Sequence, residues 1–121
     1  MLSRKLQTDG KWLLFLTLLF QLEKIFMSIT RTDIFNFKSE TECDKYIASH
    51  REFMKSLEIE GIQELHWVRA TPESLLIFSI LKSKEDADVI KSKANEWREK
   101  YKFNIHDMLV FDGELIESLK K

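Results

Sequence analysis

The spacing of apolar residues along positions 28–119 changes between the two-residue period of strands and the three-to-four-residue period of helices. β-branched, aromatic and alternating apolar residues predict strands at 28–37, 62–70, 75–81 and 104–111. Apolar residues at helical spacing predict helices at about 40–59 and from Ser83 to about Tyr101. The predicted order is therefore strand, helix, strand, strand, helix, strand.

Local signals mark the ends of several elements. Ser39 with a Glu three residues later forms a capping-box signature, and Gly61 suits the left-handed stop that ends many helices. The turn at 71–74 contains a proline, and it predicts an antiparallel hairpin between the second and third strands. Asp112-Gly113 predicts a tight turn or a bulge, followed by a short extended tail at 114–119.

This order predicts an α+β fold of the ferredoxin-like βαββαβ type, with a four-stranded antiparallel sheet and two helices on one face. The strand at 75–81 is nevertheless apolar on both of its faces. A large apolar patch is rarely left exposed, so we expect a homodimer in which two sheets stack. The alternatives are a smaller apolar face or cover supplied by residues 12–26.

The chain resembles a known family over residues 28–119. The segments Ile29–Ile34, Phe78–Ala87 and Met108–Glu117 are similar to those of the dimeric α/β-barrel superfamily, which includes antibiotic-biosynthesis-monooxygenase-like (ABM-like) domains. The resemblance implies a barrel made by two sheets, with a pocket between sheet and helices in each subunit. Some members are cofactor-independent oxygenases and others degrade haem with an Asn, a Trp and a His. Ile90 stands where that Trp is expected, so haem degradation does not fit.

Two functions stay open on this scaffold. The first is a small homodimeric domain that binds a hydrophobic small molecule, with cofactor-independent monooxygenase-like chemistry as its enzymatic form. The second is a non-enzymatic ligand-sensing or protein-interaction module. A pocket with converging polar groups would favour the enzyme, whereas aromatic side chains filling that space would disfavour it.

Four residues are candidates for the ligand pocket: His50, Tyr46, Asn36 and Trp97. His50 and Tyr46 share the apolar face of the first helix, where His50 could act as a general base or could be a core histidine. Trp97 belongs to a regular helical stripe, which favours a core position over ligand stacking. Asn36 ends the first strand, where it could polarise a substrate or turn into the following helix cap.

Four residues are candidates for the dimer interface: Trp67, Phe78, His66 and His106. Trp67 is expected to anchor the interface, although it points to the opposite strand face from His66. His66 and His106 lie on the two edge strands, where they could meet across subunits or could simply be exposed. The chain has no H-x-x-x-H, H-x-H or C-x-x-C motif, so neither a metal nor a cofactor is predicted.

Composition narrows the class of protein. A chain of 121 residues with 44% hydrophobic and 32% charged residues is typical of one globular domain. The net charge of −1 gives no basic field for a nucleic-acid partner. The lone Cys43 excludes an internal disulfide and favours a reducing compartment, which predicts a cytoplasmic location.

Residues 1–26 differ from the rest, because they carry a small positive charge and an apolar run from Trp12 to Phe20. This run is far shorter than the roughly 20 residues of a membrane span, so no stable span is expected. A signal peptide fits the basic start but lacks a small-residue cleavage site, and a membrane-surface helix is a further alternative. The favoured interpretation is an extension outside a domain at 27–121, with Met27 as an alternative start.

Overall fold

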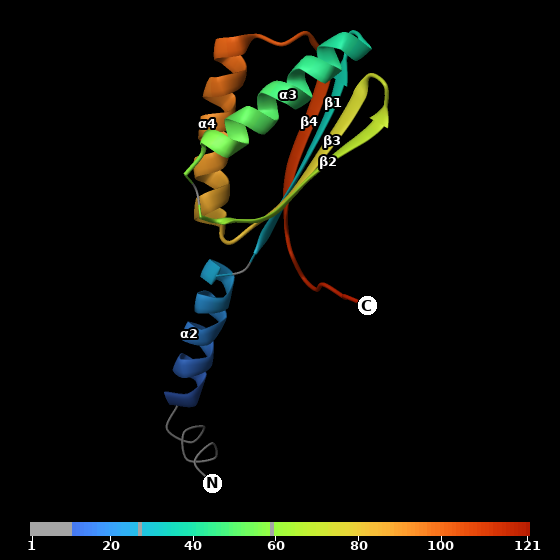
Figure 1. Cartoon of the computed structure of the whole chain (residues 1–121). Helices are drawn as coiled ribbons and strands as arrows, with labels where there is room; N and C mark the ends of the chain where they lie inside the picture. Colours follow the sequence, from blue (N-terminus) through green and yellow to red (C-terminus); the bar gives the residue numbers. More distant parts are fainter. Residues whose placement is uncertain (1–10, 27, 59) are drawn as a thin grey trace.

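The computed structural model describes residues 11–26, 28–58 and 60–121. Predictions on residues 1–10 and on Met27, including the alternative start, lie outside the described residues. The elements follow one another as α2 (Lys11–Phe26), β1 (Ile29–Phe37), α3 (Glu40–Ser56), β2 (Ile62–Thr71), β3 (Ser74–Leu81), α4 (Lys84–Tyr101) and β4 (Ile105–Glu114) (Figure 1). From β1 onwards this is the predicted βαββαβ order.

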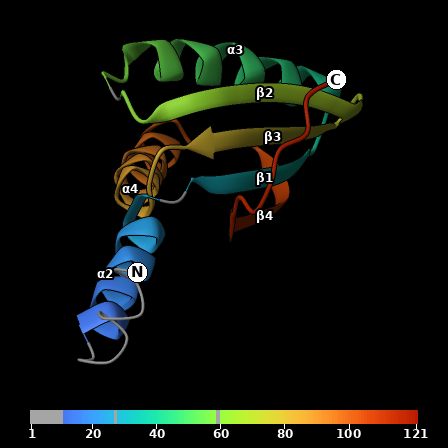
Figure 2. The same ribbon diagram turned by 90° about the horizontal axis from the view of Figure 1, so that it is seen from below.

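The four strands form one antiparallel sheet in the order β2-β3-β1-β4. β1 and β3 are the central strands, and β2 and β4 are the edges. Helices α3 and α4 lie on one side of the sheet, and the other side carries no element (Figure 2). The predicted ferredoxin-like α+β fold is confirmed.

Both sheet-packed helices begin where their caps were predicted. The Ser39 hydroxyl accepts a hydrogen bond from the Glu42 backbone N–H at 3.2 Å, and the Ser83 hydroxyl accepts one from Asp86 at the same distance. Helix α3 ends at Ser56, earlier than the predicted 59, because Leu57 has extended backbone angles (φ −78°, ψ 118°).

Gly61 has a different role from the predicted helix stop. It follows the end of α3 by several residues and is buried beside the start of α4. A Cβ atom at this position would lie 2.3 Å from Cγ of Asp86, so only a glycine leaves room for that side chain. Its carbonyl accepts the Lys82 N–H at 2.7 Å. Close packing, rather than left-handed backbone, explains this glycine.

The predicted turn or bulge at Asp112-Gly113 is wrong, because both residues continue β4 to Glu114. Asp112 pairs with Arg31 of β1 in the sheet register, and Gly113 pairs with Thr30. The Thr30 hydroxyl also donates a hydrogen bond to the Gly113 carbonyl at 3.3 Å. The long neighbouring strand therefore supplies partners that local turn propensity does not reveal. Residues 115–121 form no regular element.

Alternation along the strands divides the sheet into two faces. The helix-covered face carries the main core, in which the buried residues are Phe35, Phe37, Cys43, Tyr46, Leu75, Ile77 and Trp97. A second buried cluster comprises Leu81, Ala87 and Ile90 near the start of α4. The opposite sheet face, called here the uncovered face, takes the alternate strand residues.

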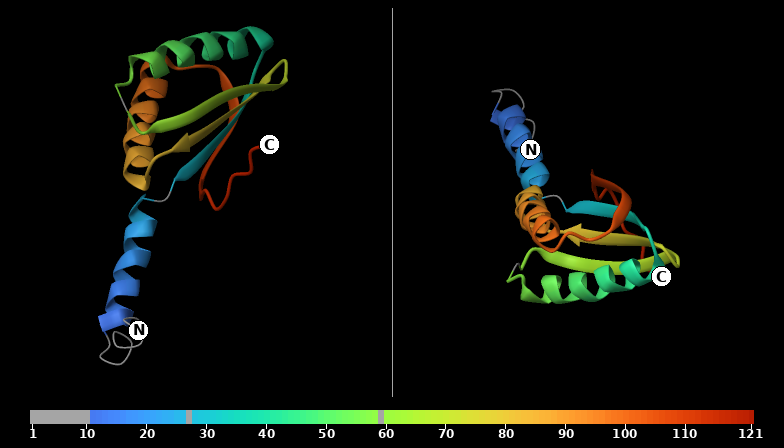
Figure 3. Two further views of the ribbon diagram at one scale, coloured as in Figure 1. Left: turned by 60° about the horizontal axis from the view of Figure 1, so that its bottom comes forward. Right: turned by 90° about the horizontal axis from the view of Figure 1, so that it is seen from above.

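Helix α2 extends away from the end of the sheet and lies over neither of its faces (Figures 1 and 3). Its apolar side chains are therefore mostly exposed, as at Leu13, Leu14, Phe15 and Leu18. The structure thus gives no support to cover of the sheet by the described part of residues 12–26. Within the described residues, no helix has the length and apolar character that crossing a membrane requires.

The core should respond strongly to truncation of Leu75, which is only 1% exposed. Leu75→Ala removes a buried side chain and leaves a cavity, so we expect a loss of about 2–5 kcal/mol in the free energy of unfolding. Chemical denaturation measures this change. Leu119→Ala, at a residue 80% exposed, is the control and should stay within about 0.5 kcal/mol of the original chain. Equal effects of the two substitutions would contradict the assignment of the core.

Candidate functional site

A small, partly open cavity, called here the charged cavity, lies between the sheet and helices α3 and α4. Its volume is about 30 Å³, which has room for a water molecule or two. Half of its lining is polar or charged, namely Arg31, Asp33, His50, Ser79, Lys91 and Arg98. Its apolar lining is Met54, Leu65, Ile77, Ile90, Ala94 and Val110. Such a concentration of ionisable groups inside a domain marks a candidate functional site.

Strand β1 brings two charges into this interior. Its helix-facing positions are Arg31, Asp33, Phe35 and Phe37, in alternation with residues of the uncovered face. Arg31 is 5% exposed and Asp33 9% exposed, so both are buried like the two phenylalanines. Neither charge is among the site residues that the sequence predicts. The available signal was their two-residue spacing in phase with buried aromatic residues.

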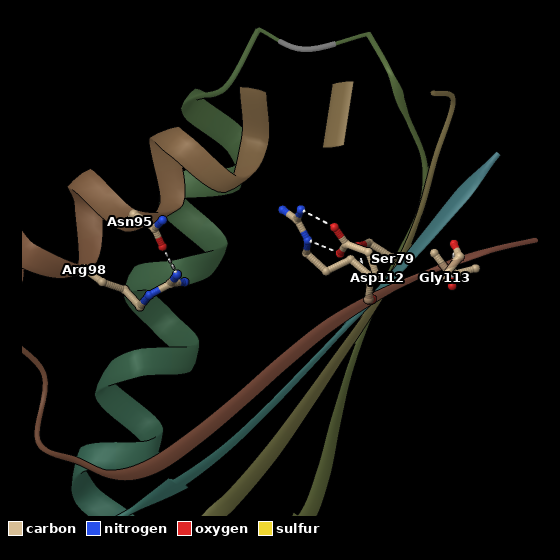
Figure 4. Close-up of polar contacts among 7 residues, drawn as sticks. Ser79, Asn95, Arg98, Asp112 and Gly113 are labelled. Carbon is tan, nitrogen blue, oxygen red and sulfur yellow. Dashed lines mark hydrogen bonds and ion pairs between the residues drawn. The ribbon is translucent and has the colours of Figure 1, made fainter. Parts of the chain in front are cut away.

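Arg31 is held by an ion pair with Asp112 of β4. Arg31 Nε and Nη2 donate to the two carboxylate oxygens at 2.7 and 3.0 Å, in the two-pronged geometry that is strongest for such pairs. This hydrogen bonding lowers the pKa of Asp112. Figure 4 shows Asp112 and Ser79 on the sheet, across from Arg98 on α4.

Asp33 has no such partner. Its Oδ1 atom is buried and makes no hydrogen bond to the described residues. Burial raises the pKa of Asp33 to about 6, although the charges of Arg31 and Arg98 oppose the rise. A buried acceptor without a donor is costly, so this oxygen is a natural contact point for a bound molecule.

His50 supplies the complementary donor. The Trp67 indole N–H donates to its Nδ1 at 2.9 Å. Burial, together with the charge of Arg98, lowers the pKa of His50 to about 4, so the ring is neutral at pH 7. Because Nδ1 accepts a hydrogen bond, the single ring proton is assigned to Nε2. His50 therefore meets the cavity as a neutral ring with one N–H donor.

Tyr46 and Trp97 pack in the core and do not line the charged cavity. The Tyr46 ring lies 4.8 Å from the Phe35 ring and 5.3 Å from that of Trp97, between ring centroids. Trp97 also stacks on Phe53 at 4.8 Å. Burial raises the pKa of the Tyr46 hydroxyl, which has no hydrogen bond within the described residues. These aromatic side chains fill the space near the middle of α3.

Asn36 lies apart from the other pocket candidates, which corrects its predicted place in the pocket. Its strand position alternates with the buried Phe35 and Phe37 and belongs to the uncovered face. Its amide donates to Asp107 at 2.6 Å and accepts a hydrogen bond from the Ser74 hydroxyl. Asn36 therefore joins three strands at one end of the sheet, on the face opposite the helices.

Trp67 also requires a correction. Its hydrogen bond to His50 places it on the helix-covered face, packed against the main core, and not on the face where two sheets would stack. Phe78 and His66 do lie on the uncovered face, with ring centroids 6.3 Å apart. His106 is exposed on β4, at the opposite sheet edge from His66.

No protein-family model and no curated protein matches this chain. Several solved structures do. A dimeric ferredoxin-like protein from an uncultured marine organism gives a TM-score of 0.63 at 14% identity, over 78% of this chain and 93% of that one. A Streptomyces coelicolor monooxygenase, solved with the ligand nanaomycin D, gives a TM-score of 0.59 at 11% identity, over 78% of this chain and 93% of that one. A cofactor-independent oxygenase from Streptomyces nogalater gives a TM-score of 0.58 at 11% identity, over 78% of this chain and 98% of that one.

These similarities establish the fold. They confirm, at that level, the resemblance to dimeric ferredoxin-like and ABM-like proteins. Identities this low carry no substrate or reaction over to this chain. Among the residues that the structure describes, no group of three or more His, Cys, Asp or Glu side chains is placed to hold a metal ion.

The two titrating groups of the cavity should affect stability in opposite directions. Asp33 has a raised pKa, so its contribution falls as pH rises from about 4 to about 6. His50 has a lowered pKa, so its contribution rises with pH from about 4 to about 6.5. The two contributions largely cancel in the original chain.

Asp33→Asn removes one of these opposing contributions. We expect the free energy of unfolding of this variant to climb with pH between about 4 and 6 more steeply than that of the original chain. Urea denaturation across that range measures both slopes. Parallel profiles would show that Asp33 keeps an ordinary pKa.

Proposed function

We propose that this chain is a homodimeric small-molecule-binding domain whose ligand site is the charged cavity. The observation that carries this proposal is the buried Oδ1 of Asp33, which lacks a donor and shares the cavity with His50, a neutral N–H donor. A mainly apolar ligand with a hydrogen-bonding group would satisfy both atoms. The apolar lining of the same cavity supports a hydrophobic ligand body.

Cofactor-independent oxygenation is the proposed chemistry, supported by the two oxygenases that share the fold. In this proposal Asp33 accepts a proton from the bound molecule, and Arg98 and His50 stabilise the carbanion that remains. Dioxygen is the oxidant: a CH2 group of the ligand becomes a carbonyl that keeps one oxygen atom, and the other oxygen atom leaves as water. All three groups line the cavity already; Asp33 and His50 are buried, and Arg98 is half-buried. No metal or organic cofactor is required to arrange them.

A non-enzymatic ligand-sensing module is the second candidate. Two observations favour it. The cavity is far smaller than the roughly 300–1,000 Å³ of ordinary ligand pockets, and Tyr46, Phe53 and Trp97 fill the adjoining space. Analysis of a bound ligand after incubation in air distinguishes the two: an added oxygen atom supports the oxygenase, and an unchanged ligand supports the sensor.

The ligand site is tested by nuclear magnetic resonance on the full chain. The signal of the Trp67 indole N–H reports on the cavity, because this group donates a hydrogen bond to His50, which lines the cavity. We expect small neutral hydroxyl and carbonyl compounds to shift this signal and to leave that of Trp12, in α2, unchanged. If no compound of these classes moves the Trp67 signal, or if all three indole signals move together, the cavity is not the ligand site.

The proposed dimer rests on the uncovered face. This face carries a continuous set of apolar side chains across all four strands: Ile34, Val68, Leu76, Phe78, Leu109 and Phe111. Leu109 is 57% exposed and Phe111 is 51% exposed in the single chain. Stacking a second sheet on them would remove much apolar surface from water. A dimeric protein with this fold supports a homodimer. Phe78 and His66 are proposed as interface residues because both lie on this face, with their rings in contact.

Leu109→Asp should separate the dimer, because a charge within the stacked apolar patch would be buried without a partner. The measurement is the mass of the native full chain. Val89→Asp is the matched control, since Val89 is a 42% exposed apolar residue on α4, away from the sheet. We expect one subunit for Leu109→Asp and two for the control. A dimer that persists in Leu109→Asp would contradict the stacked-sheet interface.

We also propose that residues 27–121 form the functional domain and that residues 1–26 are an extension. The solved structures support this division, because each covers about three-quarters of the chain. A cytoplasmic location is proposed from Cys43, the one cysteine, which is a buried free thiol. Export or attachment to a membrane surface through the exposed apolar side chains of α2 is the alternative.

A further inference from the structure

A second hollow lies on the surface next to the charged cavity. It is called here the outer pocket, has a volume of about 360 Å³, and lies between α3 and the edge strand β2. Its lining consists of Arg51, Met54, Lys55, Ile62, Leu65 and Trp67. This volume lies within the range of ordinary small-molecule pockets, whereas the charged cavity alone does not.

Two half-buried side chains separate the two spaces. Met54 of α3 and Leu65 of β2 line both the outer pocket and the charged cavity. Trp67 and His50 also connect the two spaces. Trp67 lines the outer pocket, and its indole N–H donates a hydrogen bond to His50, which lines the charged cavity. The side chains of Met54 and Leu65 are therefore shared walls of the outer pocket and the charged cavity, called here the partition.

We propose that the outer pocket and the charged cavity are one binding site for an elongated apolar alcohol, which enters when the Met54 side chain moves aside. This inference rests on the proposed function, in which the charged cavity binds the ligand. Methionine suits the role of a movable partition, because its unbranched side chain has three rotatable bonds and adapts to different shapes.

The chemistry of the two spaces defines the ligand class. The apolar body would pack on Ile62, Leu65 and Trp67 in the outer pocket. The hydroxyl would reach the inner cavity, donate to the unpaired Oδ1 of Asp33 and accept from His50, which lines the same cavity.

Charge decides between an alcohol and an alkylammonium ion. Arg51 and Lys55 line the outer pocket, and Arg31, Lys91 and Arg98 line the inner cavity. A cation would lose its hydration and would pass Arg51, Lys55, Lys91 and Arg98, which outnumber the one carboxylate of Asp33, so an alcohol should bind better than an amine of equal length.

The test is a calorimetric titration of the full chain with octan-1-ol and, for comparison, with octan-1-amine. We expect octan-1-ol to bind at least about tenfold more tightly than the amine, a difference of about 1.4 kcal/mol. Met54→Trp should weaken octan-1-ol binding by at least about tenfold, because the larger side chain blocks the passage. Met108→Trp is the matched control, since Met108 is a 48% exposed methionine on β4 that lines neither space, and it should bind like the original chain.

Met54→Ala provides a second variant that does not add bulk. It should bind octan-1-ol at least as tightly as the original chain, because it opens the passage. Unchanged affinity in Met54→Trp, with native spectra retained, would overturn the shared site. Absence of octan-1-ol binding to the original chain would overturn the ligand class alone. The proposed function would then still be judged by the response of the Trp67 signal to small hydroxyl and carbonyl compounds.

Discussion

The central strand β1 imposes the constraint on which the rest of the structure depends. It pairs on both sides, so all of its helix-facing residues are buried whatever their chemistry. Phe35 and Phe37 at one end pack in the aromatic core, while Arg31 and Asp33 at the other end need polar or charged neighbours. A single run of alternating residues thereby divides the interior into a packed half and a charged half.

The charged half is tolerated inside the domain because its groups either have an ion-pair partner or shift their pKa toward the neutral form. Arg31 has the two carboxylate oxygens of Asp112, and this pair also fastens the end of β4 to β1. Asp33 and His50 both move toward their neutral forms, since burial raises the pKa of one and lowers that of the other. The price of this arrangement is one carboxylate oxygen without a donor, a feature that selection for stability alone would remove.

The fold was predictable from the sequence because each element has an independent local signal. Apolar spacing defined the strands and helices, and Ser39 and Ser83 fixed where two helices begin. Gly61 and Asp112 were misread for one shared reason: the contacts that decide them come from residues distant in sequence, namely Asp86 and Arg31. Local sequence propensity does not reveal contacts between residues that are distant in the sequence.

The candidate site was predictable only in part, for a related physical reason. His50 could be placed because a helical stripe determines which way its side chain points. Trp67 and Asn36 were assigned to the wrong faces, since strand alternation gives two faces but does not say which one the helices cover. Asp33 and Arg31 could have been found by one rule: a charge in phase with buried aromatic residues is itself buried.

In the proposed dimer, one face of the sheet would form the subunit contact and the other would hold the ligand site. The uncovered face carries the apolar patch that spans all four strands, which suits it to contact a second copy of the chain. The helix-covered face holds the ionisable groups, and His50 and Asp33 line one cavity within a single subunit. A subunit that is separated from its partner should therefore keep the atoms of its cavity in place. It would instead expose apolar strands, so any effect of dissociation on binding would reflect movement of the shared central strands β1 and β3, whose alternate residues form both faces.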